Sequence, residues 1–148
     1  IVLITHEMDV VRTISHRFAI MSKGRITEVS SIEKVFQTHP SSHPLIEDLK
    51  LALPEPIKNR LSLIPQENYY PLCQIMFYGE QSQKAIMSEL SHLYSLTINI
   101  LQANIDTIGI HTFGILTVQI KGDKTQINLA FDSLKQHQLT MEIIGYVK

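Results

Sequence analysis

The sequence of 148 residues contains one cysteine, no tryptophan and only six glycines. A single cysteine, Cys73, excludes an internal disulfide and is typical of a reducing compartment. No apolar run reaches the length of about 18 residues that a membrane-spanning helix needs, and the apolar start lacks the basic leader of a signal peptide. The net charge is −1, without an acidic or basic tail, so the composition indicates neither disorder nor a strong attraction to nucleic acid. We expect a soluble, folded chain.

The first five residues form an apolar, β-branched run, Ile-Val-Leu-Ile-Thr, without polar alternation. Such a run is typical of a strand that is buried on both faces of a parallel sheet. A helical pattern begins directly after it, with Thr5 in position to cap the helix and with Glu7 and Asp9 near the positive end of its dipole. We interpret the segment as a strand-to-helix turn from a larger α/β domain, and we expect residues 1–4 to be exposed without that sheet.

Short elements are predicted in the rest of residues 1–52. The first helix leads into a hairpin that turns at Lys23-Gly24. Ser31 is expected to cap a second helix, and Pro44 is expected to lie in the first turn of a third.

Residues 53–71 hold four of the six prolines, with Glu, Asn and Gln between them. Because proline removes backbone donors and fixes φ, we predict an extended linker in this segment. The linker divides the chain into two predicted domains, residues 1–52 and residues 72–148.

The pattern of residues 72–148 predicts six elements in the order β-α-β-β-α-β. Apolar residues alternate in the strands and share one face in each helix, and Asp123 is expected to cap the second helix. Two right-handed crossovers fold such a unit into an antiparallel four-stranded sheet with both helices on one face, an α+β fold of ferredoxin-like, ACT-like type. The predicted strands cover residues 72–78, 98–105, 113–120 and 139–147, and the predicted helices cover residues 81–94 and a segment that starts at 123.

Two parts of the sequence resemble known families. Residues 4–11, Ile-Thr-His-Glu-Met-Asp-Val-Val, and the later Met-Ser-Lys-Gly-Arg-Ile at 21–26 resemble the switch-histidine segment and hairpin of ABC-transporter ATP-binding subunits. The match continues through Val-Phe at 35–36 and His-Pro at 43–44. Residues 72–148 resemble the small ligand-binding domain that follows the ATPase in methionine-importer ATP-binding subunits, down to the closing Gly-Tyr-Val. The first 52 residues are therefore interpreted as a truncated piece of an α/β ABC ATPase domain.

This resemblance implies the regulatory part of the ATP-binding subunit of a methionine ABC importer. In that family the C-terminal domain is expected to bind L-methionine, to form a homodimer and to inhibit transport when internal methionine is high. The resemblance also implies a membrane permease subunit as partner and a cytoplasmic position, peripheral on the inner face of the cell membrane. It implies no nucleic-acid partner.

The motifs that bind ATP in the family are missing from this sequence. There is no G-x-x-x-x-G-K-[ST] loop, because the first glycine is Gly24, and the signature motif and the strand with the catalytic glutamate are missing as well. We expect no ATP hydrolysis and no cofactor in this chain, with ATP and magnesium belonging to an intact parent. His6 matches the switch histidine, a catalytic role that applies only in an intact ATPase. From the residues alone, His6 is an ordinary first-turn histidine.

Asn99 interrupts an apolar strand and is the main candidate for ligand binding. A carboxamide carries donors and an acceptor, so it can bind both the ammonium and the carboxylate of a free amino acid. From the residues alone, however, an exposed edge or turn asparagine is the favoured interpretation. The resemblance implies that Asn99 belongs to the methionine site, with Ile98 and Ile100 beside it. Phe113 and Gly114 also match: Phe113 offers an apolar wall, and Gly114 leaves room for a close backbone approach.

Metal and thiol chemistry are not expected. His39 and His43 lie four residues apart, a spacing that suits zinc on a helix, but Pro40 and Pro44 interrupt that helix and no third ligand is near in sequence. Cys73 lies on an apolar strand face and is interpreted as a core residue.

Two further function classes are weighed as alternatives. The β-α-β-β-α-β order also builds RNA-binding modules, and residues 111–118 faintly match their central motif, but the basic residue and two stacking aromatics are missing. An amino-acid enzyme on this scaffold is disfavoured, because residues 72–148 contain no carboxylate pair, no nucleophile with a base and no metal cluster.

Overall fold

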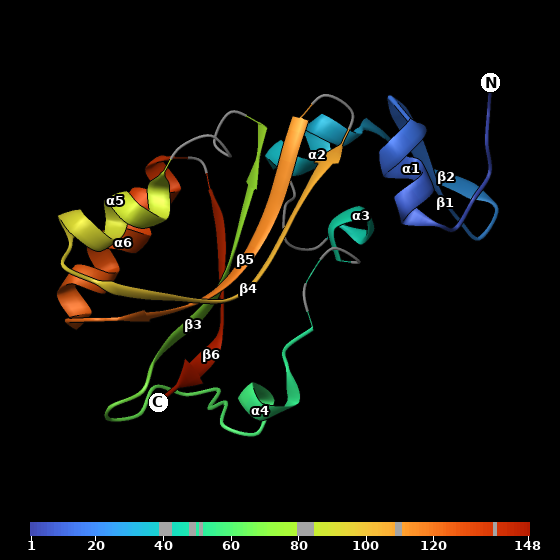
Figure 1. The fold of residues 1–148 in the computed structure, drawn as a ribbon. Coiled ribbons are helices and arrows are strands. Elements are labelled where there is room, and N and C mark those ends of the chain that lie inside the picture. Colours follow the sequence, from blue (N-terminus) through green and yellow to red (C-terminus); the bar gives the residue numbers. More distant parts are fainter. Residues whose placement is uncertain (39–42, 48–49, 51, 80–84, 109–110, 138) are drawn as a thin grey trace. The chain divides into compact units, whose positions relative to one another are not determined.

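The computed structural model places the chain as two compact units (Figure 1). The first unit comprises residues 1–50 and 107–111, and the second comprises residues 51–106 and 112–148. The domain limits given by the sequence analysis stay predictions. The structure describes all residues except 39–42, 48–49, 51, 80–84, 109–110 and 138.

The first unit contains the helices α1 (Met8–Ile14), α2 (Ile32–Thr38) and α3 (Pro44–Glu47) and the antiparallel hairpin of β1 (Arg17–Ser22) and β2 (Arg25–Ser31). Positive φ angles at Lys23 (50°) and Gly24 (74°) close the predicted turn, as a two-residue hairpin loop requires. The expected cap of α2 is confirmed, because the Lys34 amide donates a 3.3 Å hydrogen bond to Ser31 Oγ.

The start of the chain differs from two predictions. Residues 1–5 form no strand, and residues 1–4 are exposed as expected for a segment without a neighbouring strand to pair with. The N-cap of α1 is Glu7 and not Thr5, because the Thr5 hydroxyl accepts the Glu7 amide at 3.0 Å before the helix begins. That bond forms a local turn, a role that threonine takes as readily as capping.

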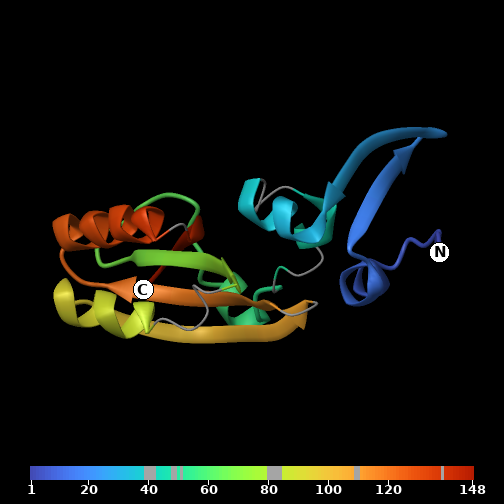
Figure 2. The same ribbon diagram turned by 90° about the horizontal axis from the view of Figure 1, so that it is seen from above.

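The second unit contains six main elements in the order β-α-β-β-α-β, which confirms the predicted α+β class. Its four-stranded sheet has the order β4-β5-β3-β6, and β3 is antiparallel to both β5 and β6. Helices α5 and α6 lie side by side on one face of this sheet (Figures 1 and 2). The elements are β3 (Tyr70–Tyr78), α5 (Ile86–Leu93), β4 (Thr97–Ile108), β5 (His111–Lys121), α6 (Lys124–Gln136) and β6 (Thr140–Val147). The last two residues of β4 and the first residue of β5 are grouped with the first unit.

A hydrophobic core lies between the two helices and the sheet. Asp123 caps α6 as predicted, since its Oδ1 accepts the Thr125 amide at 2.8 Å. Leu93, the last residue of α5, is 69% exposed, whereas Ile86 and Leu90 of the same helix are buried. None of the described helices is long and apolar enough to span a membrane. The buried core residues include Cys73, Ile75, Leu90, Leu116, Val118, Ile120, Ala130 and Leu134.

Cys73 lies fully buried in this core, and burial raises the pKa of its thiol from 9.0 to about 12. Above pH 9.0 the unfolded chain loses the thiol proton while the folded chain keeps it. The free energy of unfolding should therefore fall by about 1.4 kcal/mol per pH unit on this account, and the loss should end near the folded pKa. Urea unfolding of wild type and Cys73→Ala at pH values on both sides of 9.0 measures the difference in slope. Equal slopes in the two proteins would contradict this prediction.

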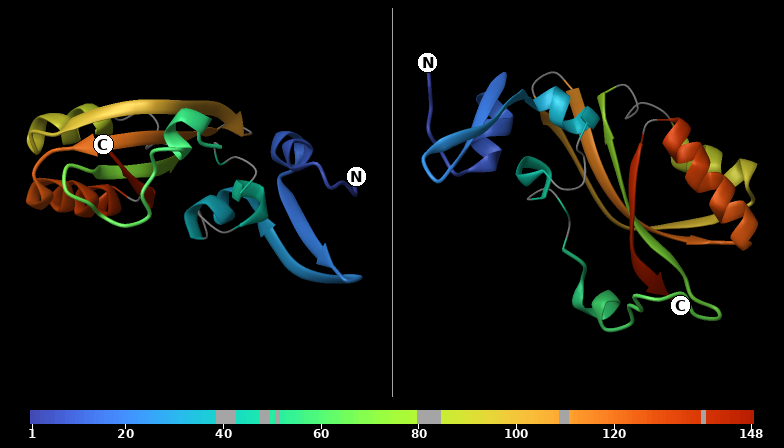
Figure 3. Two further views of the ribbon diagram at one scale, coloured as in Figure 1. Left: turned by 90° about the horizontal axis from the view of Figure 1, so that it is seen from below. Right: turned by 180° about the vertical axis from the view of Figure 1, so that it is seen from behind.

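Residues 52–69, here called the strap, precede the sheet of the second unit and differ from the predicted extended linker. They contain a short helix, α4 (Glu55–Lys58), with Pro54 at its N-cap and Pro56 in its first turn. Proline is compatible with a first turn, whose amides have no intrahelical partner, so these prolines begin a helix rather than exclude one. Figure 3 shows the strap, in green, reaching the C-terminal end of β6.

Two contacts tie the strap to the sheet. Ser62 and Tyr146 of β6 exchange backbone hydrogen bonds, of 2.9 Å from the Ser62 amide and 2.8 Å from the Tyr146 amide. At the other edge of the sheet, Nε2 of Gln102 in β4 donates to the carbonyl of Ala52 at 3.1 Å. The strap is therefore attached to both edge strands of the sheet.

Candidate functional site

The start of β4 carries three of the predicted site residues, on two faces of the strand. Ile98 is partly buried against the core, whereas Asn99 and Ile100 are exposed. Because successive side chains of a strand point to opposite faces, Asn99 lies on the face away from Ile98 and Ile100. The carboxamide of Asn99 is therefore accessible, but on a different surface from its two neighbours.

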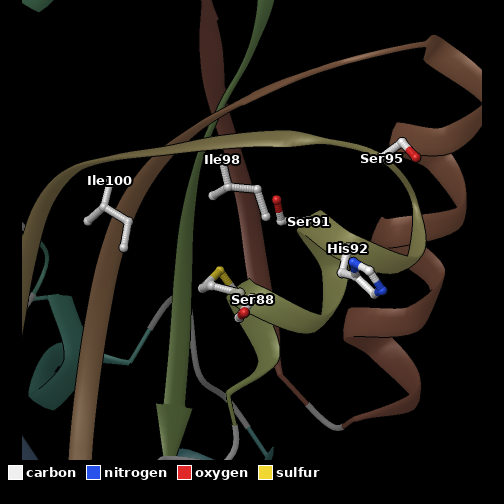
Figure 4. A pocket seen from close by; sticks show the side chains of 7 residues that line it. Ser88, Ser91, His92, Ser95, Ile98 and Ile100 are labelled. Atoms are coloured by element: carbon white, nitrogen blue, oxygen red, sulfur yellow. The ribbon is translucent and has the colours of Figure 1, made fainter.

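An open groove lies between α5 and β4, on the face of Ile98 and Ile100. Figure 4 shows Ser88, Ser91 and His92 on α5 opposite the two isoleucines. The Ser91 hydroxyl is already used, since it donates to the Leu96 carbonyl at 2.6 Å. Serine hydroxyls and one imidazole facing apolar side chains could hold a small amphipathic molecule. The groove is lined by Met87, Ser88, Ser91, His92, Ser95, Ile98 and Ile100.

Phe113 and Gly114 lie elsewhere in the sheet. Asn99 is nine residues before the end of β4, whereas Gly114 is three residues after the start of β5. Measured from the end of the sheet where β4 meets β5, the two positions thus differ by nine minus three residues. At about 3.3 Å per residue, they lie about 20 Å apart along the sheet. Phe113 is fully buried, and the space expected at Gly114 is filled, since a Cβ there would lie 2.0 Å from Cζ of Phe77. One copy of the chain does not bring these residues together with Asn99.

Lys121 and Tyr70 are site candidates that the sequence analysis missed. The Nζ of Lys121 lies 5.7 Å from the centre of the Tyr70 ring, a cation–π contact. β5 ends at Lys121, and only two residues separate β4 from β5, which makes the pair an antiparallel hairpin. The end of β5 therefore lies beside the start of β4, so this cation is at the same end of the sheet as Asn99. Sequence alone shows a lysine at a strand end but not which strands meet there.

His6 lies in the turn before α1, in an open surface depression with Glu7, Met8, Asp9 and Arg12. Arg12 is buried, forms an ion pair with Asp9 and donates from Nη1 to the Leu45 carbonyl at 2.9 Å. The His6 side chain is exposed. Its role in an intact ATPase stays a prediction.

His43 uses both ring nitrogens in the first unit. Its Nδ1 accepts the Leu45 amide at 3.2 Å, so Nε2 carries the proton that it donates to Glu28 Oε2 at 3.1 Å. His39, the other histidine of the weighed zinc pair, lies outside the described residues. Among the residues that are described, no group of three or more His, Cys, Asp or Glu is placed to hold a metal ion.

The RNA-binding alternative would need exposed aromatic side chains on β5. The aromatic residue of its segment 113–118 is Phe113, which is fully buried, and the other positions of that segment are buried too. Residues 113–118 therefore offer no accessible ring on which bases could stack.

Known proteins are similar in sequence to this chain. Residues 71–143 match the NIL domain family. Over 99% of its length the chain is 34% identical to "Methionine import ATP-binding protein MetN" of Vibrio vulnificus (strain YJ016), of which it covers 44%. It is 36% identical, again over 99% of its length, to the protein of the same name from Francisella tularensis subsp. holarctica (strain OSU18), of which it covers 43%. The chain thus spans less than half the length of these relatives.

A solved structure is similar as well. It is the crystal structure of the C-terminal domain of an ABC transporter / ATP-binding protein from Enterococcus faecalis. The likeness has a TM-score of 0.47 and 28% sequence identity, and it covers 51% of this chain and 84% of that one.

Proposed function

We propose, from the premise that this chain belongs through residues 71–143 to the NIL domain family, that its second unit is the methionine-binding regulatory domain of a methionine importer. The strand order β4-β5-β3-β6 with both helices on one face supports including the ferredoxin-like, ACT-like fold in this proposal. In the proposed parent, a subunit with its own ATP and magnesium site drives import through a membrane permease.

The accessible carboxamide of Asn99 is the observation that carries the proposal. An exposed asparagine in an otherwise apolar stretch of strand offers donors to a carboxylate and an acceptor to an ammonium group. Lys121, at the same end of the sheet, adds a positive charge that favours a ligand with a carboxylate. Free methionine has the matching head group.

The affinity of such a site should be modest. Burial of the thioether side chain contributes about 2 kcal/mol at about 25 cal/mol per Å², and a few charge-assisted hydrogen bonds add to this. The dissociation constant is then on the order of micromolar to millimolar. A weak site responds to an accumulated nutrient rather than to traces of it.

Replacement of Asn99 by alanine should weaken L-methionine binding by on the order of tenfold or more, because it removes hydrogen bonds to charged ligand groups. Isothermal titration calorimetry of the full chain measures this. Asn128→Ala, on the exposed side of α6, is the matched control and should bind like wild type. An absence of heat in wild type at millimolar methionine, or an unchanged affinity in Asn99→Ala, would overturn the proposed function.

The proposal includes a homodimer formed through β4. This strand ends the sheet order, is 12 residues long and contains no Lys, Arg or Pro, the residues that usually protect an exposed edge. Ile100 and Ile105 on this strand are 52% and 61% exposed. Phe113 and Gly114 are distant from Asn99 in one copy. In this proposal they contribute to the site either by supporting β5, the strand next to β4, or from the second copy of the dimer.

Regulation follows from the same arrangement. Methionine slows transport if it binds better to the state that holds the two ATPase domains apart, and a differential affinity of about 1–3 kcal/mol is typical of such coupling. The chain itself is proposed to have no ATPase activity, and its first unit to be the end of an ATPase domain whose other motifs lie elsewhere in the parent.

A further inference from the structure

The hydrogen bond between Gln102 and Ala52 connects two parts of the second unit that are 50 residues apart in sequence. Gln102 lies three residues after Asn99 on β4. Ala52 lies at the beginning of the strap, just after the boundary of the first unit at Lys50. A single side chain therefore links the strand of the proposed ligand site to the segment that leads to the rest of the protein.

Contacts within the strap limit its bending. Within it, α4 is reinforced by an ion pair of 2.8 Å between Lys58 Nζ and Glu55 Oε1, and Arg60 Nε donates to the Pro56 carbonyl at 3.0 Å. Its far end is fixed by the backbone pair of Ser62 with β6. Because proline and the helix limit bending in between, a displacement at the Ala52 end is carried along the strap instead of being absorbed locally.

The Gln102 carboxamide is only half satisfied. Its Nε2 donates to Ala52, whereas its Oε1 is buried and has no hydrogen-bond partner among the described residues. A buried acceptor without a partner loses the hydrogen bond that water gives it in the unfolded chain. A shift of β4 that gave this oxygen a donor would recover that interaction and would also change the bond to Ala52.

From these contacts we propose that Gln102 is a positioning residue that transmits methionine occupancy at Asn99 to the strap through its hydrogen bond to Ala52. This inference rests on the proposed function and adds its route of regulation. Methionine at Asn99 fixes the start of β4, the Gln102 side chain follows the strand, and the strap reports the change toward the first unit.

Hydrogen–deuterium exchange of the full chain, with and without saturating L-methionine, tests the route. Methionine should change the exchange rates of strap amides in wild type by on the order of fivefold. Gln102→Leu should bind methionine with an affinity within about twofold of wild type and lose the response of the strap. Gln102→Glu, which keeps the length and lacks the amide donor, should behave like Gln102→Leu. Gln136→Leu, at the exposed end of α6, should keep the response.

The outcomes separate the two proposals. Wild type that fails to bind methionine in calorimetry overturns the proposed function and this inference with it. Wild type that binds methionine without a change in strap exchange overturns this inference alone. A response that persists in both Gln102 variants also overturns it, because another route then carries the signal.

Discussion

Gly145→Ala is expected to destabilise the second unit by about 3 kcal/mol, through backbone strain and a clash with the strap. Gly145 has φ +156°, a conformation that side-chain-bearing residues rarely adopt. A Cβ there would lie 2.5 Å from Cδ1 of Leu61 and 2.8 Å from the carbonyl oxygen of Ser62. The leucine side chain can turn away, but the Ser62 oxygen accepts the Tyr146 amide, so the clash is relieved only by breaking that pair. The substitution should therefore also detach the strap from β6.

Urea unfolding and exchange of the strap amides measure both consequences. Gly122→Ala is the matched control: Gly122 has a similar φ of +159°, but its Cβ would meet a flexible side chain, Cδ2 of Leu96 at 2.4 Å. Gly122→Ala should lower the free energy of unfolding by about 1 kcal/mol, which is the part of the effect that comes from backbone conformation. If both variants lose equal stability and strap exchange does not change, the backbone pair at Ser62 does not fix the strap.

Gly114→Ala should cost a similar amount, about 3 kcal/mol, for a purely steric reason. A Cβ at this position would lie 2.0 to 2.7 Å from three atoms of the Phe77 ring, on the strand paired with β5. The φ of Gly114 is not positive, so no conformational strain is added. The ring must leave its place in the core, where it packs against the buried cluster.

A double-mutant cycle isolates this contact. Phe77→Leu alone should destabilise by about 1 kcal/mol or more because it leaves a gap, and it should make room for the alanine at 114. The double variant should be more stable than the sum of the single changes predicts, with a coupling of at least about 1 kcal/mol in urea unfolding. Additive losses would mean that Phe77 does not fill the space over Gly114.

The elements of the second unit are predictable from sequence because their patterns are periodic. Alternation in the strands and the face shared by Ile127, Ala130 and Leu134 reflect burial directly, and Asp123 marks the helix start by its chemistry. Helix α4 is hard to predict because proline disfavours the interior of a helix, whereas the first turn accepts it. Such local rules have exceptions that depend on position within the element.

The candidate site was only partly predictable. Asn99 is conspicuous in sequence because a carboxamide interrupts an apolar strand, and the structure places it at an accessible position. The cation–π contact of Lys121 with Tyr70 and the bond of Gln102 to Ala52 join residues 50 or more positions apart. Neither contact has a local sequence signal, because both depend on strand order and register, which only the folded sheet defines.

Among the described residues, one edge strand of the four-stranded sheet is paired with the strap and the other is not, and this difference bears on how copies of the chain could assemble. The strap occupies the outer side of β6 at Tyr146, while β4 ends the sheet on the other side. A sheet with two open edges can add neighbours without end and grow into a filament. A sheet with one covered edge can pair only through its other edge, which gives a closed dimer with twofold symmetry. If the proposed dimer forms through β4, the strap at Tyr146 hinders further addition at β6.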